Sequence, residues 1–242
     1  DYIEKRNDIL FRECAPDPDS LTRRKDLVVG IPRCFSVYTL WPLYSWFFHA
    51  LGVETLLSEE IVQEGAARVE SSYCFPAEIA HGAVQDIFNR KADKIFLPHF
   101  RDMDSYEKTA PANFCPITQS LPYYIKKAFP EIPEEKYLTP VISFMYGLEK
   151  AAEPFIAMAA DLGFGESEAK QAFLQAYEKQ MECFAKFAEL GKQALAEARR
   201  AERPVIAILG RPYNSFTADA NMGIPRKYTS RGYSVIPFDI LP

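Results

Sequence analysis

The chain has 242 residues, of which 28 are Lys or Arg and 33 are Asp or Glu, so its net charge is −5. That charge argues against a surface that coats nucleic acid, and we expect no nucleic-acid partner. Hydrophobic residues make up 48% of the chain, enough for the core of one large domain or two small ones. The most apolar run, residues 41–52, is far shorter than the ~20 residues of a membrane-spanning helix, and residues 1–10 have no apolar centre typical of a signal peptide. We therefore expect no membrane partner.

The five cysteines are odd in number and widely spaced along the chain. This is unlike the disulfide framework of a small secreted protein, and it favours the reducing cytoplasm. There the thiols would be free, catalytic or bound to a metal. They are Cys14, Cys34, Cys74, Cys115 and Cys183.

The hydrophobic pattern divides the chain into four parts. Residues 1–25 form a polar lead-in, in which the basic cluster at 23–25 is expected to be a solvated loop. Residues 26–146 form a first α/β lobe, 147–203 a helical segment, and 204–242 the beginning of a second α/β lobe. The predicted fold class is therefore α/β, with a Rossmann-like parallel-sheet lobe, a helical segment and the start of a second Rossmann-like lobe.

Short apolar runs in the first lobe alternate with runs of helical periodicity, which is typical of βαβ units in a parallel sheet. In chain order we expect a strand at 27–31, a helix at 41–51, a strand at 53–57, a helix at 76–92, a strand at 94–100, and a strand or helix start at 141–145.

The second half of the chain is first helical and then returns to the α/β pattern. Residues 147–202 have aromatic side chains three and four positions apart, which marks the buried stripe of a helix. A strand is then expected from residue 204, followed by a turn at 209–215 and a second strand within 233–239. Because the chain ends directly after this strand, we expect an incomplete lobe and a fragment of a larger protein.

Cys74 and Cys115 each stand immediately before a helix-starting motif, Phe75-Pro76 in the first case and Pro116 in the second. Proline suits the first turn of a helix, because its missing N–H would be unpaired there. Each cysteine is therefore expected near an N-cap, where free N–H groups and the helix dipole favour a thiolate. Two such thiolates at the carboxyl edge of one parallel sheet would suit an anionic iron–sulfur cluster.

Other interpretations of these cysteines stay open. Each is also explained as a small buried residue at a helix start, since no Cys-x-x-Cys pair is present. The same lack, with no paired histidines, disfavours zinc. A nucleophilic cysteine would need a base, and His81 lies about two helical turns from Cys74. His81 is therefore a candidate pocket residue only.

Two further candidates follow predicted strands. Arg211 lies in the turn LGRPYNS at 209–215, where it and the backbone N–H groups could meet an anion, although a proline-directed turn explains the motif equally well. Cys34 follows the first strand and is a further possible ligand.

Several motifs occur in an order that resembles one known family. They are VGIPR (29–33), SSYCFPAEIAHGAVQDIF (71–88), KIFLPHF (94–100), NFCPITQSLP (113–122), AILGRPYN (207–214) and YSVIPFDILP (233–242). Together they resemble the CoA-substrate-specific enzyme activase family, which includes the large activators of 2-hydroxyglutaryl-CoA dehydratase. The resemblance covers nearly the whole chain.

The resemblance implies a multidomain anaerobic protein with upstream ATPase modules that are absent from this chain. It likens the chain to the iron–sulfur subunits of 2-hydroxyacyl-CoA dehydratases, which have two Rossmann-like lobes with a cluster between them. In that setting three cysteines hold a cubane 4Fe-4S cluster. Cys74 and Cys115 match two of them, the third is expected beyond residue 242, and Cys34 is a possible substitute.

The function expected from the resemblance is low-potential electron transfer, driven by ATP in the upstream modules, to a CoA thioester or a dehydratase partner. The alternative is a metal-free, dehydratase-like lobe that acts as a scaffold or binds a CoA compound. In either case this chain alone is not expected to be an active enzyme.

Overall fold

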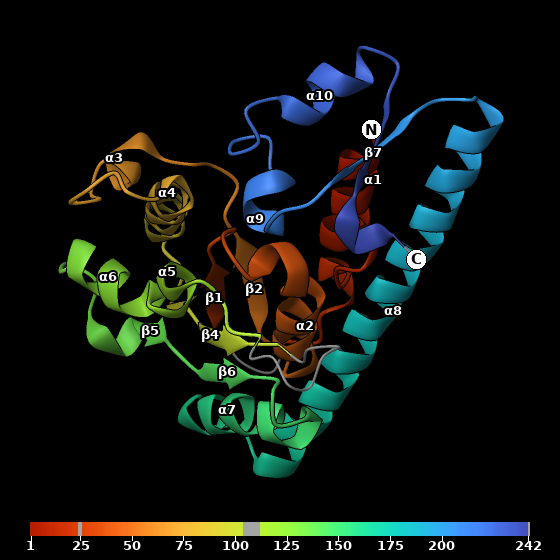
Figure 1. Ribbon diagram of the computed structural model, residues 1–242. Helices are drawn as coiled ribbons and strands as arrows, with labels where there is room; N and C mark the ends of the chain where they lie inside the picture. The colour runs from red at the N-terminus through yellow and green to blue at the C-terminus, as the bar shows by residue number, and fades with distance from the viewer. Residues whose placement is uncertain (24–25, 104–111, 242) are drawn as a thin grey trace.

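Four parallel strands form the main sheet of the computed structural model, which describes residues 1–23, 26–103 and 112–241 (Figure 1). The strand order is β2-β1-β3-β5, and every pairing is parallel. The strands are β1 (Val28–Ile31), β2 (Glu54–Leu57), β3 (Lys94–Phe96) and β5 (Tyr137–Leu138). The predicted α/β class with a parallel sheet is confirmed. Two residues of the basic cluster, 24 and 25, lie outside the described residues.

Helices connect the strands and occupy most of the second half of the chain. The α-helices are α1 (Tyr2–Asp8), α2 (Val37–Ala50), α3 (Gln63–Ala66), α4 (Phe75–Asn89), α5 (Pro116–Gln119), α6 (Leu121–Ala128), α7 (Leu148–Asp161), α8 (Glu166–Arg200), α9 (Pro212–Ser215) and α10 (Ile224–Thr229). A π-helical segment η1 (Ile9–Glu13) and the 3₁₀ turns η2 (Pro18–Ser20), η3 (Glu134–Lys136) and η4 (Phe238–Ile240) complete the set. Within the described residues, no helix is both long and apolar enough to cross a membrane.

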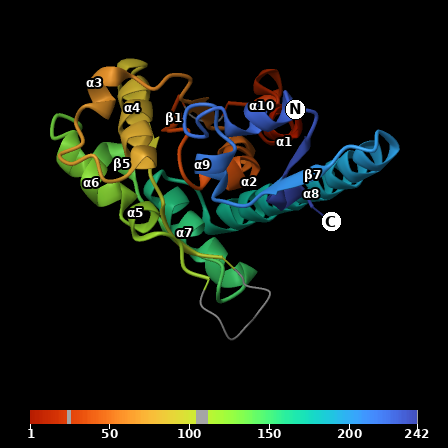
Figure 2. The same ribbon diagram turned by 45° about the horizontal axis from the view of Figure 1, so that its top comes forward.

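Helices cover both faces of the main sheet, because successive side chains of a strand point to opposite faces. Phe96 and Leu138 face a hydrophobic cluster completed by α2, α7 and α8. Ile95 and Tyr137, one residue earlier in each strand, face a second cluster completed by α4 and α6. In Figures 1 and 2, α4 and α6 accordingly lie on one side of the molecule and α8 on the other.

Gly30 lets α4 approach β1 closely. A Cβ atom at this position would lie 2.2 Å from Ile87 Cγ2 and 2.9 Å from the Cβ of Ala92. Both distances are below van der Waals contact, so a larger residue would push the helix off the sheet. The first strand therefore needs glycine for packing.

The strand expected at 94–100 is two strands, because Pro98 has no N–H to continue a ladder. β3 stays in the main sheet, while β4 (His99–Asp102) pairs in parallel with β6 (Val141–Ser143). The buried Asp102 carboxylate stabilises this pair: it accepts hydrogen bonds from the Ser143 hydroxyl at 2.6 Å and from the Met145 N–H at 3.0 Å.

The helix expected at 41–51 begins at Val37 and contains Pro42, with Leu40 in a non-helical conformation. The buried side chain of Gln180, from α8, replaces the helical hydrogen bond lost at this kink. Its amide nitrogen donates to the Thr39 carbonyl at 3.0 Å and its oxygen accepts from the Leu43 N–H at 3.2 Å. One side chain thus satisfies two buried backbone groups that would otherwise be unpaired.

A second, two-stranded parallel sheet consists of β7 (Val205–Ile208) and β8 (Ser234–Pro237), with α9 and α10 between them in the chain. This is the βαβ beginning expected for the second lobe. It is packed against α8, where Gly191 leaves room for η4: a Cβ on Gly191 would lie 1.7 Å from the Ile240 carbonyl oxygen.

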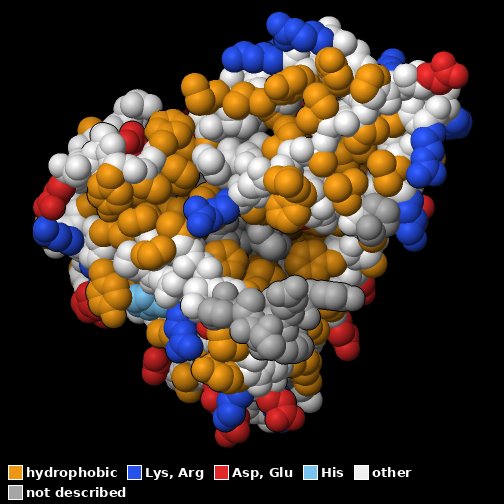
Figure 3. Space-filling view, viewed as in Figure 1, with side chains coloured by type: hydrophobic (Ala, Val, Ile, Leu, Met, Phe, Trp, Pro, Cys, Tyr) orange, Lys and Arg blue, Asp and Glu red, His pale blue; other side chains and the backbone are white. Residues whose placement is uncertain are grey.

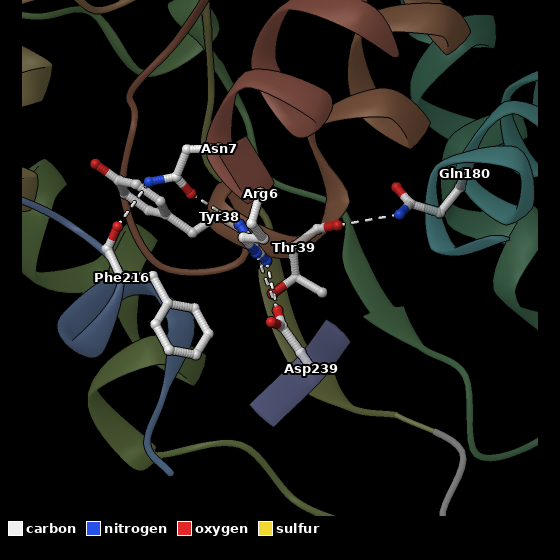
Figure 4. Close-up of polar contacts among 7 residues, drawn as sticks. All are labelled: Arg6, Asn7, Tyr38, Thr39, Gln180, Phe216 and Asp239. Atoms are coloured by element: carbon white, nitrogen blue, oxygen red, sulfur yellow. Dashed lines mark hydrogen bonds and ion pairs between the residues drawn. The ribbon is translucent and has the colours of Figure 1, made fainter. Parts of the chain in front are cut away.

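Helix α1 places a fully buried arginine between the two α/β parts (Figure 4). Nη2 of Arg6 donates to Asp239 Oδ2 and to the Tyr38 carbonyl, both at 2.7 Å, and Nε donates to Asp239 Oδ2 at 3.1 Å. The guanidinium also lies over the rings of Phe187 and Phe216, at 4.7 and 5.5 Å. A buried cation is tolerated only with such partners.

Replacing Arg6 with Ala is expected to lower the free energy of unfolding by about 3–5 kcal/mol, because the Asp239 carboxylate is left without its cation. Urea unfolding measures the change. Arg12→Ala is the control, since its side chain is 82% exposed and pairs with Asp8 at 3.3 Å. The control should cost less than about 0.5 kcal/mol. Equal losses in the two variants would contradict the role given to Arg6.

Candidate functional site

Cys74 is the N-cap residue of α4, the position that the sequence predicted. Its backbone is extended (φ −149°, ψ 102°), and its carbonyl accepts a hydrogen bond from the Ala77 N–H at 2.9 Å. Pro76 occupies the first turn, so the helix starts where proline permits. The Cys74 side chain is partly buried and packs against the cluster between the sheet and α4.

Cys115 is likewise an N-cap residue, but its helix, α5, has only four residues. The helix dipole expected beside both cysteines is therefore present at α4 but not at α5, because one turn aligns few peptide dipoles. A backbone hydrogen bond next to Cys115 fixes its position: the Phe114 N–H donates to the Arg101 carbonyl on β4 at 2.8 Å.

The charges of three cysteines influence the pKa of one buried tyrosine, Tyr124. The hydroxyl of this tyrosine, on α6, is buried and has no hydrogen-bond partner among the described residues. Burial raises the pKa of Tyr124, and negative charge on Cys34, Cys74 and Cys115 raises it further. Cys34, Cys74 and Cys115, which lie in three separate segments, are therefore close enough for their charges to act on the unpaired Tyr124 hydroxyl.

Cys34 differs from the other two in its exposure. It is 4% exposed, in the loop after β1, and burial raises the pKa of its thiol to about 12. At neutral pH this thiol keeps its proton unless a cation or metal ion stabilises the thiolate.

Tyr213, in the turn expected at 209–215, is a site residue that the sequence analysis missed. Its ring packs edge-to-face on Phe35 at 5.0 Å between centroids, and its hydroxyl accepts a hydrogen bond from the Thr118 hydroxyl at 3.5 Å. Burial raises the pKa of Tyr213, and charge on Cys115 and Cys74 adds to the effect. The second α/β part thus reaches the cysteines of the first through this aromatic ring. The only signal in the sequence was an aromatic residue within the motif.

Arg211, the residue of this turn singled out for anion binding, is exposed and precedes α9 as its N-cap residue. Helix α9 has only four residues. The structure therefore places Arg211 at the surface near Tyr213 and adds nothing that points to an anion.

His81 is buried in α4 and lies beside Tyr124. Its Nδ1–H donates to the Ala77 carbonyl at 2.7 Å, and its ring stacks on Tyr124 at 5.3 Å. Burial lowers the pKa of His81, which keeps the ring neutral at pH 7. It lines a cavity of about 460 Å³ together with Arg68 and Lys127, whose charges are paired with Glu131 and Glu70.

A larger and mostly apolar cavity, of about 590 Å³, lies next to Cys74. Phe75 lines it from α4, and Ile208, Met222 and Ile224 line it from the second α/β part. Figure 3 shows apolar side chains gathered around a hollow on this face. The volume is within the range of small-molecule sites.

No group of three or more His, Cys, Asp or Glu side chains in the described part of the chain is arranged to hold a metal ion. The candidate site therefore consists of Cys34, Cys74 and Cys115, whose charges influence Tyr124, with Tyr213 nearby on the second α/β part. An apolar cavity lies next to it at Phe75. The parallel main sheet and its two helical layers define the class as Rossmann-like α/β.

The chain belongs to the family described as the CoA enzyme activase uncharacterised domain, whose model matches residues 28–241. The resemblance to CoA enzyme activases is thus confirmed. Neither the curated proteins nor the solved structures include a match to the chain.

Truncating Tyr213 to Ala is expected to lower the free energy of unfolding by about 3–5 kcal/mol, because a buried ring is lost from the contact between the two parts. Tyr213→Phe should cost about 1 kcal/mol or less, since only the long hydrogen bond to Thr118 is removed. Urea unfolding of both variants separates the contribution of ring packing from that of the hydroxyl. Tyr146→Ala is the control, because this tyrosine is 65% exposed. If the alanine variants lose equal stability, the packing role is wrong.

Stability is expected to fall as the pH drops below about 6.5, in part through His81. The pKa of this ring is lower in the folded than in the unfolded chain, so the unfolded chain binds the proton more tightly. Full stability is present above pH 6.5 and is lost below it. His81→Asn should flatten the curve of unfolding free energy against pH between 7.5 and 5.5. His49→Asn, at a less buried histidine, should flatten it less; the reverse order would contradict this assignment.

Proposed function

We propose that Cys74 and Cys115 bind an iron–sulfur cluster and that this activase domain passes a low-potential electron to a 2-hydroxyacyl-CoA dehydratase-type system. The observation that supports this most is that both N-cap cysteines lie close enough to the buried, unpaired hydroxyl of Tyr124 for their charges to raise its pKa. The ATP that drives the transfer would be hydrolysed by modules of the same full-length protein. A CoA thioester or a dehydratase would be the acceptor.

The residues present fit such a cluster in chemistry. Cysteine thiolates are the usual ligands of iron–sulfur clusters, and all five cysteines are free of disulfides, as in a reducing cytoplasm. Two thiolates are too few for a cubane. Cys34, buried beside the same tyrosine, or a cysteine from outside this chain would have to supply a further ligand.

The protein's own groups would set the properties of the site. When bound, the cluster supplies a centre that accepts and releases single electrons at low potential. The Tyr124 hydroxyl, which is buried and unpaired among the described residues, would donate to a cluster sulfur. Tyr213 and Phe35 would exclude water from one side.

A second candidate function is the binding of a CoA compound without metal. The apolar cavity of about 590 Å³ beside Phe75 supports it, because a cavity of this size accepts an acyl or pantetheine chain. In that case the cysteines would be small packing residues and the domain a binding module or scaffold.

Anaerobic reconstitution of the full-length protein with iron and sulfide tests the first proposal. We expect bound iron and a low-temperature EPR signal after reduction, and we expect Cys74→Ser and Cys115→Ser each to lose most of both. Cys183→Ser is the matched control, because this thiol lies in the other hydrophobic cluster and should leave the iron content unchanged.

Either of two outcomes would contradict the cluster. One is a folded protein that takes up no iron, and the other is an equal loss of iron in the control. Thermal unfolding with and without acyl-CoA then tests the second function. A rise in Tm that Phe75→Ala abolishes, in the absence of iron, would support the binding module.

A further inference from the structure

Two cysteines that the proposed cluster does not use lie in the same hydrophobic cluster, on the face of the main sheet that α2 and α8 cover. Cys14 follows the π-helical segment η1, and Cys183 lies in the middle of α8. The two thiols are close enough that hydrogen bonding between them affects the pKa of each. Both are free thiols in the same hydrophobic cluster, 8% and 0% exposed.

An ion pair joins the same two elements next to the thiols. Lys186 Nζ, one turn after Cys183, lies 3.1 Å from Glu13 Oε2, the residue before Cys14. These two side chains are 47% and 54% exposed, so the thiol pair lies directly beneath the surface. The backbone at Cys14 is also fixed in place, because its carbonyl accepts a hydrogen bond from the Trp46 indole N–H at 2.8 Å.

The two thiols are unequal. Hydrogen bonding with Cys183 lowers the pKa of Cys14, and the charge of Lys186 lowers it further, against the opposing effects of burial and of the nearby glutamates. The same hydrogen bond, together with burial, raises the pKa of Cys183. The pair therefore combines a thiol that ionises more easily than an ordinary cysteine, Cys14, with one that keeps its proton, Cys183. A nucleophilic thiol beside a resolving thiol is the arrangement of a redox-sensitive pair.

We propose that Cys14 and Cys183 are a modification site that a peroxide oxidises to a disulfide. The Cys14 thiolate attacks one oxygen of hydrogen peroxide, the O–O bond breaks, and Cys14 becomes a sulfenic acid while hydroxide leaves and is protonated to water. The Cys183 sulfur then attacks the Cys14 sulfur, the S–O bond breaks, and the Cys183 proton leaves with the oxygen as a second water. Two thiols lose two electrons in total, and one peroxide is reduced to two waters.

The disulfide would fasten the segment that carries Arg6 to α8. Residues 14 and 183 are far apart in the chain, so the link would restrict the unfolded state strongly. It would leave Cys74 and Cys115 untouched, because Cys74 packs against the other hydrophobic cluster and Cys115 belongs to neither cluster. Oxidation of this pair is therefore a property independent of cluster binding.

Treating the full-length protein with hydrogen peroxide, blocking the remaining thiols and mapping peptides without reduction tests the proposal. We expect one linked pair of peptides containing Cys14 and Cys183, lighter by two hydrogens than the free peptides, and its loss on reduction. The Tm of the oxidised protein should rise by roughly 5–15 °C.

Matched variants make the result decisive. Cys14→Ser and Cys183→Ala should abolish both the link and the rise in Tm, whereas Cys34→Ser, at another buried thiol, should keep both. Lys186→Met should slow the peroxide-driven loss of thiols by roughly twofold or more, because the thiolate of Cys14 loses its neighbouring charge. A folded protein that keeps Cys14 and Cys183 unlinked under peroxide, or one that links Cys14 to other cysteines equally often, overturns the proposal.

Discussion

The buried guanidinium of Arg6 is the interaction on which the arrangement of the whole chain depends. A guanidinium buried away from water needs protein acceptors for its N–H groups. Here Tyr38 at the start of α2 and Asp239 after β8 provide them. Asp239 in turn has one oxygen without a partner among the described residues, so the pair is not optimal for stability. Its role is geometric: by contacting both Tyr38 and Asp239, Arg6 ties the end of β8 to the start of α2. Tyr213 reaches the cysteines because of that link.

The features that the sequence predicted are those that neighbouring residues decide. Alternating apolar runs and helical periodicity gave the parallel sheet and the long helices, and proline gave the N-cap positions of Cys74 and Cys115. Local rules also explain two errors. Pro98 divides an apparently continuous apolar run into two strands, and Pro42 lies inside a kinked helix that was expected to begin near it.

The other structural features depend on contacts between residues far apart in the chain, and local sequence patterns do not predict such contacts. Gln180 has the appearance of an exposed helix residue, yet it pairs the backbone of α2. Arg6 lies in a polar stretch and is fully buried. Tyr213 belongs to a turn whose arginine drew attention, although the tyrosine makes the contact with the site. Cys14 and Cys183 are far apart in the sequence and lie in one hydrophobic cluster of the fold.

Helix α8 belongs to both parts of the molecule at once. Its 35 residues span about 50 Å, and they pack on α2 and α7 of the first part and on β8 and η4 of the second. Neither part can therefore come apart without uncovering an apolar stripe that the other part shares. Cooperativity follows from this: the protein should have no stable half-unfolded intermediate, and a fragment that lacks either part should be prone to aggregate.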